Sequence, residues 1–395
     1  MLHIGIECES IEGPESWGVG RIVKKLLEEI ARRPELEKEF KFFLYFKSKI
    51  PDYPWLANPI FAKKVILNHS QILKNLRIDS FSLYYYICLP IKLWFEKLDL
   101  MFFPNYMLSP LFRGESLVML TEDIYYEIRR PDLRLRYKLA YKIFAEWWAA
   151  RYATKIMATS ETSKSEVSKL FKISPDRIVV NALGVDAPKI ITRNQQLETS
   201  NYVLYVGQAF PRRHLRETML AFEYLVEHTT ERLNLVEAQP LSSLKLIAVG
   251  KDKYNPPIIK KLAEETNNRL GHSAIIYKEY VPEEELTALY ANAKCVVYIS
   301  SKEAFGLPPL EALSYGVPAV VSDEPINHEI YGGNVFMVRQ PITPETIAEA
   351  IKDGLTNEIR RQKIKESAER ILEKYTWQKH TDRFLQIIRS QKLQS

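Results

Sequence analysis

The sequence contains few cysteines, no long apolar run and no leader pattern. Its three cysteines, Cys8, Cys88 and Cys295, are scattered, without the paired spacing of a zinc site or the density of a disulfide framework. No stretch approaches the roughly 20 apolar residues that a membrane-spanning helix needs, and the first residues lack a basic segment followed by an apolar one. We therefore expect neither a disulfide-stabilised secreted protein nor a membrane-spanning one, but a protein of the reducing cytoplasm.

Low-complexity segments and short-period repeats are also missing. Hydrophobic and charged contents of 46% and 26% are those of an ordinary globular protein. A chain of 395 residues is too long for one ordinary core, so two domains are expected. The polar residues 187–201 show little apolar periodicity and are interpreted as the linker. This places an N-terminal domain at 1–190 and a C-terminal domain at 191–376.

Positive charge is concentrated in the first half of the chain. Through Lys189 there are 29 Lys and Arg against 23 Asp and Glu, whereas the remainder has 26 of each. A mildly basic N-terminal half can attract phosphates, an anionic acceptor or an anionic lipid surface, which makes peripheral membrane contact one interpretation and ordinary surface charge the other. Because the surplus is modest and no stripe of basic and aromatic residues stands out, nucleic-acid binding is not expected.

Short apolar runs alternate with helical stretches in both halves. This alternation predicts parallel strands joined by helical crossovers, which is an α/β fold. The expected strands are residues 3–7, 42–46, 64–67, 100–103, 117–120, 155–158 and 177–180, and then 202–206, 244–249, 274–277, 295–299 and 319–321. Beyond residue 344 the sequence predicts helix to its end.

Two aromatic-rich helical stretches occur in the first half. Residues 83–95 are too short to span a membrane and contain a proline, so a half-buried helix is expected, with peripheral membrane contact as the alternative. Residues 135–152 contain the adjacent Trp147 and Trp148. At helical spacing, these aromatic residues are expected in the core and at the domain interface.

The most informative stretch is residues 300–316, a predicted strand–turn–helix. Gly306 permits a tight turn, the two prolines that follow suit a first helical turn, and Gly316 suits the C-terminal cap. Because the first N–H groups of such a helix have no partner within it, this stretch predicts an anion site. Glu303 and Glu311 flank the turn, and carboxylates repel an anion, so they are expected to accept hydrogen bonds from hydroxyls. A ligand with both phosphate and hydroxyls is a nucleotide sugar.

Further candidate residues follow other predicted strands. Gly207 ends a strand, and Arg212 and Arg213 follow it, so their guanidinium groups suit a diphosphate; a solvated arginine pair is the alternative. Gly18 and Gly20 open a helix near the end of the first strand, where a phosphate can approach the backbone.

These motifs resemble those of family 4 glycosyltransferases, and the resemblance covers nearly the whole chain. Residues 301–316 are similar to the family's Glu-x7-Glu signature, residues 205–214 to its strand, glycine and Pro-Arg-Lys-Asn loop, and residues 280–293 to the stretch beside the nucleotide base. Weaker similarities lie at Gly18–Arg21 and at Asp123, which matches the second residue of a His-Asp dipeptide.

The resemblance implies the GT-B fold, in which two Rossmann-like βαβ domains face each other across a cleft, and a C-terminal helix at 377–395 packs back on the first domain. It implies a retaining hexosyltransferase of glycan biosynthesis that needs no metal and no cofactor. The co-substrate would be a nucleotide diphosphate sugar, with UDP or GDP expected. The acceptor would be a glycan, or a lipid-linked or protein-linked hydroxyl, and the enzyme would be cytoplasmic, with or without membrane association.

The resemblance also assigns residues to three groups. Arg212 and Arg213 would stabilise the leaving diphosphate, Glu303 would contact a donor-sugar hydroxyl, and Glu311 would hold the ribose. The predicted catalytic residues are Arg212, Arg213, Glu303 and Asp123; the donor-binding residues are Gly207, Val281, Phe305, Gly306, Leu307 and Glu311; the acceptor and diphosphate loop has Trp17, Gly18, Gly20 and Glu122; no metal ligands are predicted.

Several residues depart from the family pattern. Arg213 replaces the usual Lys, His214 the following Asn, and Gln208 a frequent Arg. Glu122 replaces the His of the His-Asp dipeptide, and Trp17 replaces a glycine. Two other functions stay open: a GT-B sugar-nucleotide epimerase or hydrolase, and a non-catalytic protein that binds nucleotide sugars, in which Glu122 and Gln208 would mark a decayed site.

Overall fold

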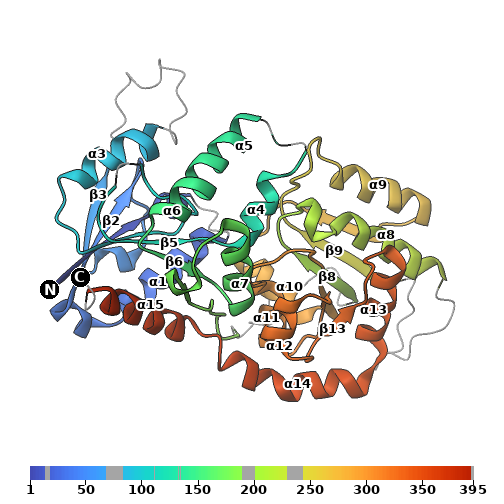
Figure 1. The fold of residues 1–395 in the computed structure, drawn as a ribbon. Coiled ribbons are helices and arrows are strands. Elements are labelled where there is room, and N and C mark those ends of the chain that lie inside the picture. The colour runs from blue at the N-terminus through green and yellow to red at the C-terminus, as the bar shows by residue number, and fades with distance from the viewer. Residues whose placement is uncertain are drawn as a thin grey trace. The chain divides into compact units, whose positions relative to one another are not determined.

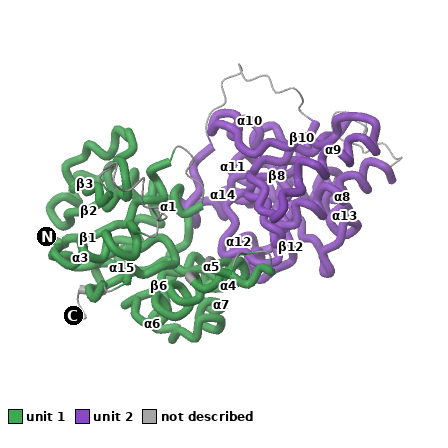
Figure 2. The backbone as a smooth tube through the Cα atoms, turned by 90° about the horizontal axis from the view of Figure 1, so that it is seen from above, with its two compact units in different colours: residues 1–183, 377–395 green, residues 184–376 purple. Residues whose placement is uncertain are grey.

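The computed structural model describes residues 1–13, 18–67, 83–110, 112–131, 133, 135–188, 201–228 and 243–392. The chain divides into two compact units, residues 1–183 with 377–395, and residues 184–376 (Figure 2). The boundary lies before the predicted residue 190, because the Val185 N–H donates to the Tyr375 carbonyl at 2.9 Å and ties residues 184–188 to the second unit. Trp17 and most of the predicted linker lie outside the described residues.

The first unit contains a seven-stranded parallel sheet with the order β3-β2-β1-β4-β5-β6-β7 (Figure 1). Every residue of β4 and β5 is buried, as expected for parallel strands with both faces covered by helices. The strands are β1 (Leu2–Glu7), β2 (Phe40–Phe46), β3 (Phe61–Val65), β4 (Leu100–Phe103), β5 (Ser116–Met119), β6 (Lys155–Ala158) and β7 (Ile178–Val180). The α/β prediction is confirmed, although β3 begins and ends earlier than expected.

The helices of the first unit follow the predicted stretches, with π-helical turns in both aromatic segments. The segment from Tyr84 consists of the π-turn η5 (Tyr84–Cys88) and α3 (Leu89–Trp94), and the second consists of α5 (Leu135–Tyr141), the π-turn η6 (Lys142–Ala149) and α6 (Ala150–Tyr152). The others are α1 (Val19–Ala31), α4 (Glu122–Ile128), α7 (Glu161–Phe171) and α15 (Trp377–Lys392). None of the helices in the described ranges is long and apolar enough to cross a bilayer.

The second unit contains a six-stranded parallel sheet with the order β10-β9-β8-β11-β12-β13. Its strands are β8 (Tyr202–Val206), β9 (Lys245–Val249), β10 (Ile275–Lys278), β11 (Cys295–Tyr298), β12 (Ala319–Ser322) and β13 (Phe336–Val338). Its helices are α8 (Leu215–His228), α9 (Ile259–Leu270), α10 (Glu283–Asn292), α11 (Leu307–Ser314), α12 (Pro325–Tyr331), α13 (Pro344–Thr356) and α14 (Glu358–Leu372). The sequence analysis missed α9, α12 and β13.

Both sheets reverse their strand order once, and this places the candidate sites. In the first unit the reversal lies between β1 and β4, and in the second between β8 and β11. In open α/β sheets, ligands bind beyond the carboxyl ends of the strands at such a reversal. The predicted motifs after β8 and β11 therefore share the ligand-binding end of their sheet.

The C-terminal helix α15 belongs to the first unit, where it lies against α1. The buried ring of Phe384 contacts the ring of Phe102 in β4, with centroids 5.1 Å apart. At the surface, the Arg389 guanidinium donates two hydrogen bonds to the Glu39 carboxylate, at 2.7 and 2.6 Å. Because the contact between Phe384 and Phe102 is buried and the Arg389–Glu39 ion pair is half exposed, the aromatic contact contributes more to the free energy of unfolding.

We predict that Phe384→Ala destabilises the first unit by about 3–5 kcal/mol, because it removes a large buried side chain and leaves a cavity. The control Arg389→Ala should cost less than about 1 kcal/mol, since exposed ion pairs contribute little. Hydrogen exchange of peptides from α1 and β4, followed by mass spectrometry, measures both effects. Equal exchange in Phe384→Ala and the control would show that α15 does not stabilise the sheet.

Candidate active site

Two glycines bring the loops after β8 and β9 into contact. Gly207 has φ +147° and Gly250 has φ +144°, and a Cβ on Gly250 would lie 1.9 Å from the Gly207 carbonyl oxygen. The Gly207 N–H donates to the Val249 carbonyl at 2.9 Å, and the Ala209 N–H to the Lys251 carbonyl at 2.9 Å. This close approach needs a glycine at position 250, and it fixes the start of the loop that carries the two arginines.

The arginine loop is a 3-10 turn, η8 (Pro211–Arg213), followed by His214 with φ +45°. Two hydrogen bonds join this loop to the loop after β11. The Ser301 N–H donates to the Arg212 carbonyl at 2.9 Å, and the His214 Nε2 pairs with the Ser301 hydroxyl. The two loops at the strand-order reversal are therefore held together through backbone and side chain.

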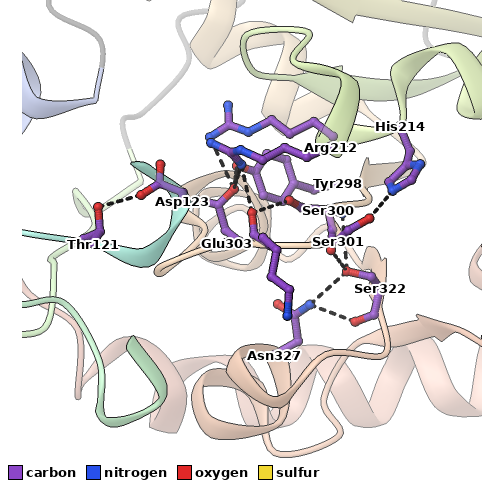
Figure 3. Close-up of polar contacts among 12 residues, drawn as sticks. Thr121, Asp123, Arg212, His214, Tyr298, Ser300, Ser301, Glu303, Ser322 and Asn327 are labelled. Atoms are coloured by element: carbon purple, nitrogen blue, oxygen red, sulfur yellow. Dashed lines mark hydrogen bonds and ion pairs between the residues drawn. The ribbon is translucent and has the colours of Figure 1, made fainter. Parts of the chain in front are cut away.

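Three donors converge on one oxygen of Glu303 (Figure 3). Its Oε2 lies 3.4 Å from Arg212 Nη1 and 3.3 Å from Arg213 Nη2, and it accepts the Tyr298 hydroxyl at 2.8 Å. Arg212 Nη1 also donates to the Lys302 carbonyl at 2.9 Å. The three charged side chains are between 11% and 16% exposed, so water screens these interactions only weakly.

The ionisation of Glu303 depends on the two arginines. Burial of its carboxyl raises the pKa, but the Arg213 and Arg212 guanidinium groups, aided by the Tyr298 hydroxyl, outweigh burial and hold the pKa below its usual range. The carboxylate is thus charged at neutral pH. Two guanidinium groups against one carboxylate give this three-residue cluster a net charge of +1, which favours an anionic ligand.

The helix α11 has the predicted form. Gly306 precedes it with φ +87°, prolines occupy its first turn, and Gly316 follows it with φ +70°. The Gly306 carbonyl accepts the Tyr331 hydroxyl at 2.8 Å, which fixes the turn. Glu311 is 8% exposed and accepts the Tyr290 hydroxyl at 2.6 Å. Each of the two glutamates thus accepts the hydroxyl of a tyrosine of the protein, and their contacts with ligand hydroxyls stay a prediction.

The predicted residues of the second unit gather at β8 and β11, with one exception. Val281 is buried just before α10, after the edge strand β10, and so lies at the edge of the sheet, two strands away from β8. Phe305 is buried with its ring 5.5 Å from that of Tyr375. The sequence analysis did not find the structural roles of Tyr298, His214 and Gly250. His214 was recognised only as a departure from the family pattern, and no local pattern marked the other two.

The first unit has a buried carboxylate at its own strand-order reversal, which the sequence analysis missed. Glu7, the last residue of β1, has no exposed surface. It accepts the Glu9 N–H at 2.8 Å, the Tyr84 hydroxyl at 3.0 Å and the Asn105 amide at 3.1 Å. These donors come from the loop after β1, from η5 and from the loop after β4. Burial raises the pKa of Glu7 to about 7, and the hydrogen bonds from Glu9 and Tyr84 oppose it.

The other predicted residues of the first unit lie at the starts of α1 and α4. Gly18 precedes α1 with φ +54°, and Gly20 is buried in its first turn. The buried Glu122 carboxylate accepts the hydroxyl of Ser163 in α7, and the Asp123 carboxylate accepts the Thr121 hydroxyl at 2.6 Å (Figure 3). The assignments of Glu122, Asp123 and the glycines to substrate contacts stay predictions. Trp17 cannot be placed, because it lies outside the described residues.

The aromatic segment at residues 135–152 corrects one expectation. Phe144 and Trp148 pack against the core of the first unit, but Trp147 and Tyr152 are 54% and 49% exposed. The aromatic content alone did not show which rings face inward.

Across the parts of the chain that the structure describes, no three His, Cys, Asp or Glu side chains are grouped to hold a metal ion.

We predict that Glu7→Gln flattens the pH dependence of stability. Because its pKa rises from 4.5 to about 7 on folding, native Glu7 binds a proton more tightly, and its stabilising contribution is lost as pH rises from 4.5 through 7. A shift of this size corresponds to about 3 kcal/mol. Urea unfolding at pH 5 and pH 8 should show a smaller difference for Glu7→Gln than for wild type. The exposed control Glu369→Gln should match wild type; an unchanged difference in Glu7→Gln would refute the assignment.

Comparison with known proteins agrees with this geometry. Residues 186–371 match the family model of glycosyl transferases group 1, which covers nearly all of the second unit. The O-antigen chain mannosyltransferase B of Escherichia coli is 29% identical over 371 residues, 90% of this chain and 91% of that protein.

Solved structures share the whole fold. WaaG, a glycosyltransferase involved in lipopolysaccharide biosynthesis, has a TM-score of 0.69 at 19% identity, with 98% of this chain and 99% of that chain covered. Anabaena Alr3699/HepE, solved in complex with UDP-glucose, has a TM-score of 0.67 at 15% identity, with 99% and 100% covered. The second unit therefore carries the domain of glycosyl transferases group 1, and the chain is a glycosyltransferase with the GT-B fold.

Proposed function

We propose that this glycosyltransferase moves a mannosyl group from a nucleotide diphosphate mannose to a hydroxyl of a growing glycan, with retention of anomeric configuration and without a metal ion. The observation that carries the proposal is the cluster of Arg212, Arg213 and Glu303 at the strand-order reversal of the second unit. The cluster supplies positive charge, fixed in place, where open α/β sheets bind ligands.

The arginine cluster suits the chemistry of the leaving group. When the bond between the sugar and the diphosphate breaks, negative charge grows on the leaving oxygen. Guanidinium groups that are already held by Glu303 and by the Lys302 carbonyl need little reorganisation to stabilise that charge. In a site screened only weakly by water, this stabilisation is strongest in the transition state, so it raises turnover more than binding. Neutralisation by arginine is also the reason to propose a reaction without metal.

The neighbouring helix completes the donor site. The N-terminus of α11, at Gly306 and Leu307, suits a phosphate or sugar oxygen, because its first N–H groups have no partner within the helix. Glu311 lies one turn further along α11, and its carboxylate already accepts a hydroxyl. We assign it to the ribose of the donor. Glu303 both anchors the arginines and offers a carboxylate to the donor sugar.

The sugar and the acceptor are proposed from the relatives. A relative that matches across 90% of this chain is named as a mannosyltransferase of the O-antigen chain, and WaaG is described as involved in lipopolysaccharide biosynthesis. The description of WaaG points to a glycan attached to a lipid, and we propose a lipid-linked glycan as acceptor at the cytoplasmic membrane surface. The nucleoside diphosphate of the donor is UDP or GDP; the HepE structure holds UDP-glucose.

We predict that a screen of UDP- and GDP-sugars identifies a mannosyl donor, and that Arg213→Ala lowers kcat by about 10²-fold to 10³-fold. Arg213→Lys should recover part of the loss, since it keeps the charge without the fork geometry. Arg216→Ala, which removes a half-exposed arginine of α8, is the matched control and should keep full turnover. Product analysis by NMR gives the linkage and the anomeric configuration.

Two results would overturn this proposal. Wild-type turnover in Arg213→Ala would remove the arginine cluster from the reaction. Release of free sugar or an epimerised nucleotide sugar, with the same yield whether or not acceptor is present, would instead indicate a hydrolase or epimerase.

A further inference from the structure

Exposed apolar side chains are concentrated on two segments of the first unit. Of the 15 large hydrophobic side chains exposed in the described parts of the chain, nine lie on residues 83–97 or 135–152, so the exposure is not scattered. They are Ile87, Ile91, Trp94, Phe95, Leu135, Leu139, Ile143, Trp147 and Tyr152. Soluble proteins rarely expose a large contiguous apolar patch without a partner for it.

The two segments lie next to each other. The Tyr86 ring in η5 stacks on the Phe144 ring in η6, with centroids 4.1 Å apart and an interplanar angle of 23°. Their inward faces are buried: Leu89 and Leu93 of the first segment and Ala149 of the second belong to one hydrophobic core cluster. The exposed apolar residues are thus the outer faces of two neighbouring helical segments, and the core does not use them.

The exposed charges on these segments have one sign. Lys92 and Lys97 are exposed on the first segment, and Lys142 and Arg151 on the second. The described residues of both segments include no exposed acidic side chain. The two acidic residues there are mostly buried beside cations: Glu96 Oε1 lies 2.6 Å from Lys64 Nζ, and Glu146 Oε1 lies 2.5 Å from Arg129 Nη1.

We propose that residues 83–97 and 135–152 form a docking surface for an anionic lipid bilayer. Tryptophan and phenylalanine suit the interface between headgroups and acyl chains, lysine and arginine suit anionic headgroups, and helices of this length lie on a membrane rather than cross it. A protein partner fits less well, because protein interfaces are depleted in lysine and these segments offer no exposed carboxylate to pair with a basic side chain.

This surface deepens the proposed function, since an enzyme acting on a lipid-linked glycan must work at a bilayer. Docking itself rests on the exposed side chains and not on the arginine cluster. The two proposals can therefore fail separately.

The test is flotation of the full chain with phosphatidylcholine vesicles, with and without phosphatidylglycerol. Wild type should bind the anionic vesicles and bind less at high salt. Trp94→Glu combined with Trp147→Glu should weaken that binding by about tenfold or more, because it places anionic charge among apolar anchors. The matched control is Ile359→Glu, which changes an 88% exposed isoleucine of the second unit and should bind as wild type does. Circular dichroism and turnover with a soluble short-glycan acceptor check that the double variant remains folded.

Three outcomes would overturn the docking proposal. The first is binding to anionic vesicles no greater than to pure phosphatidylcholine, and the second is equal binding by wild type and the double variant. The third is a dimer, detected by light scattering, that the double variant abolishes, which would assign the surface to a second copy of the chain. Vesicle binding without any sugar transfer would instead refute the proposed function and leave docking intact.

Discussion

The second unit depends on a buried carboxylate held between two guanidinium groups. Glu303 joins Arg212 and Arg213, and with them the loops after β8 and β11, at the strand-order reversal of the sheet. Removal of Glu303 would leave two neighbouring guanidinium groups without this carboxylate in a weakly screened site. Breaking a buried ion pair in this way typically costs about 3–5 kcal/mol. The contact therefore fixes both the geometry of the loops and the positive charge that an anionic donor needs.

Each unit places a glutamate beside the strand-order reversal of its sheet, but the two have opposite electrostatics. Glu7 ends β1 among neutral donors and other acidic groups, and burial raises its pKa. Glu303 follows β11 beside two arginines, which lower its pKa in spite of burial. A glutamate thus has a pKa of about 7 in one unit and a pKa below its usual range in the other, because the environment sets the protonation state. We assign the ionised one to the donor and the other to holding together η5 and the loops after β1 and β4.

Sequence patterns predicted what depends on local rules. The strands follow apolar runs, and the left-handed conformations of Gly306 and Gly316 follow from their places around a short helix. Partners that meet only in the fold were not predictable: nothing local pairs Glu7 with Tyr84 and Asn105. Nor did helical spacing show that Trp147 is exposed, because apolar periodicity identifies a face without identifying what covers it.

The most direct test of the account is a calorimetric comparison of nucleoside diphosphate and nucleoside binding, with UDP, GDP, uridine and guanosine, to wild type and Arg213→Ala. If the cluster binds the diphosphate, wild type should bind UDP or GDP much more tightly than the corresponding nucleoside. In Arg213→Ala the ratio of these two affinities should fall by about tenfold or more, while the affinity for the nucleoside stays unchanged. An Arg213→Ala variant that keeps the full preference for the diphosphate would contradict the account.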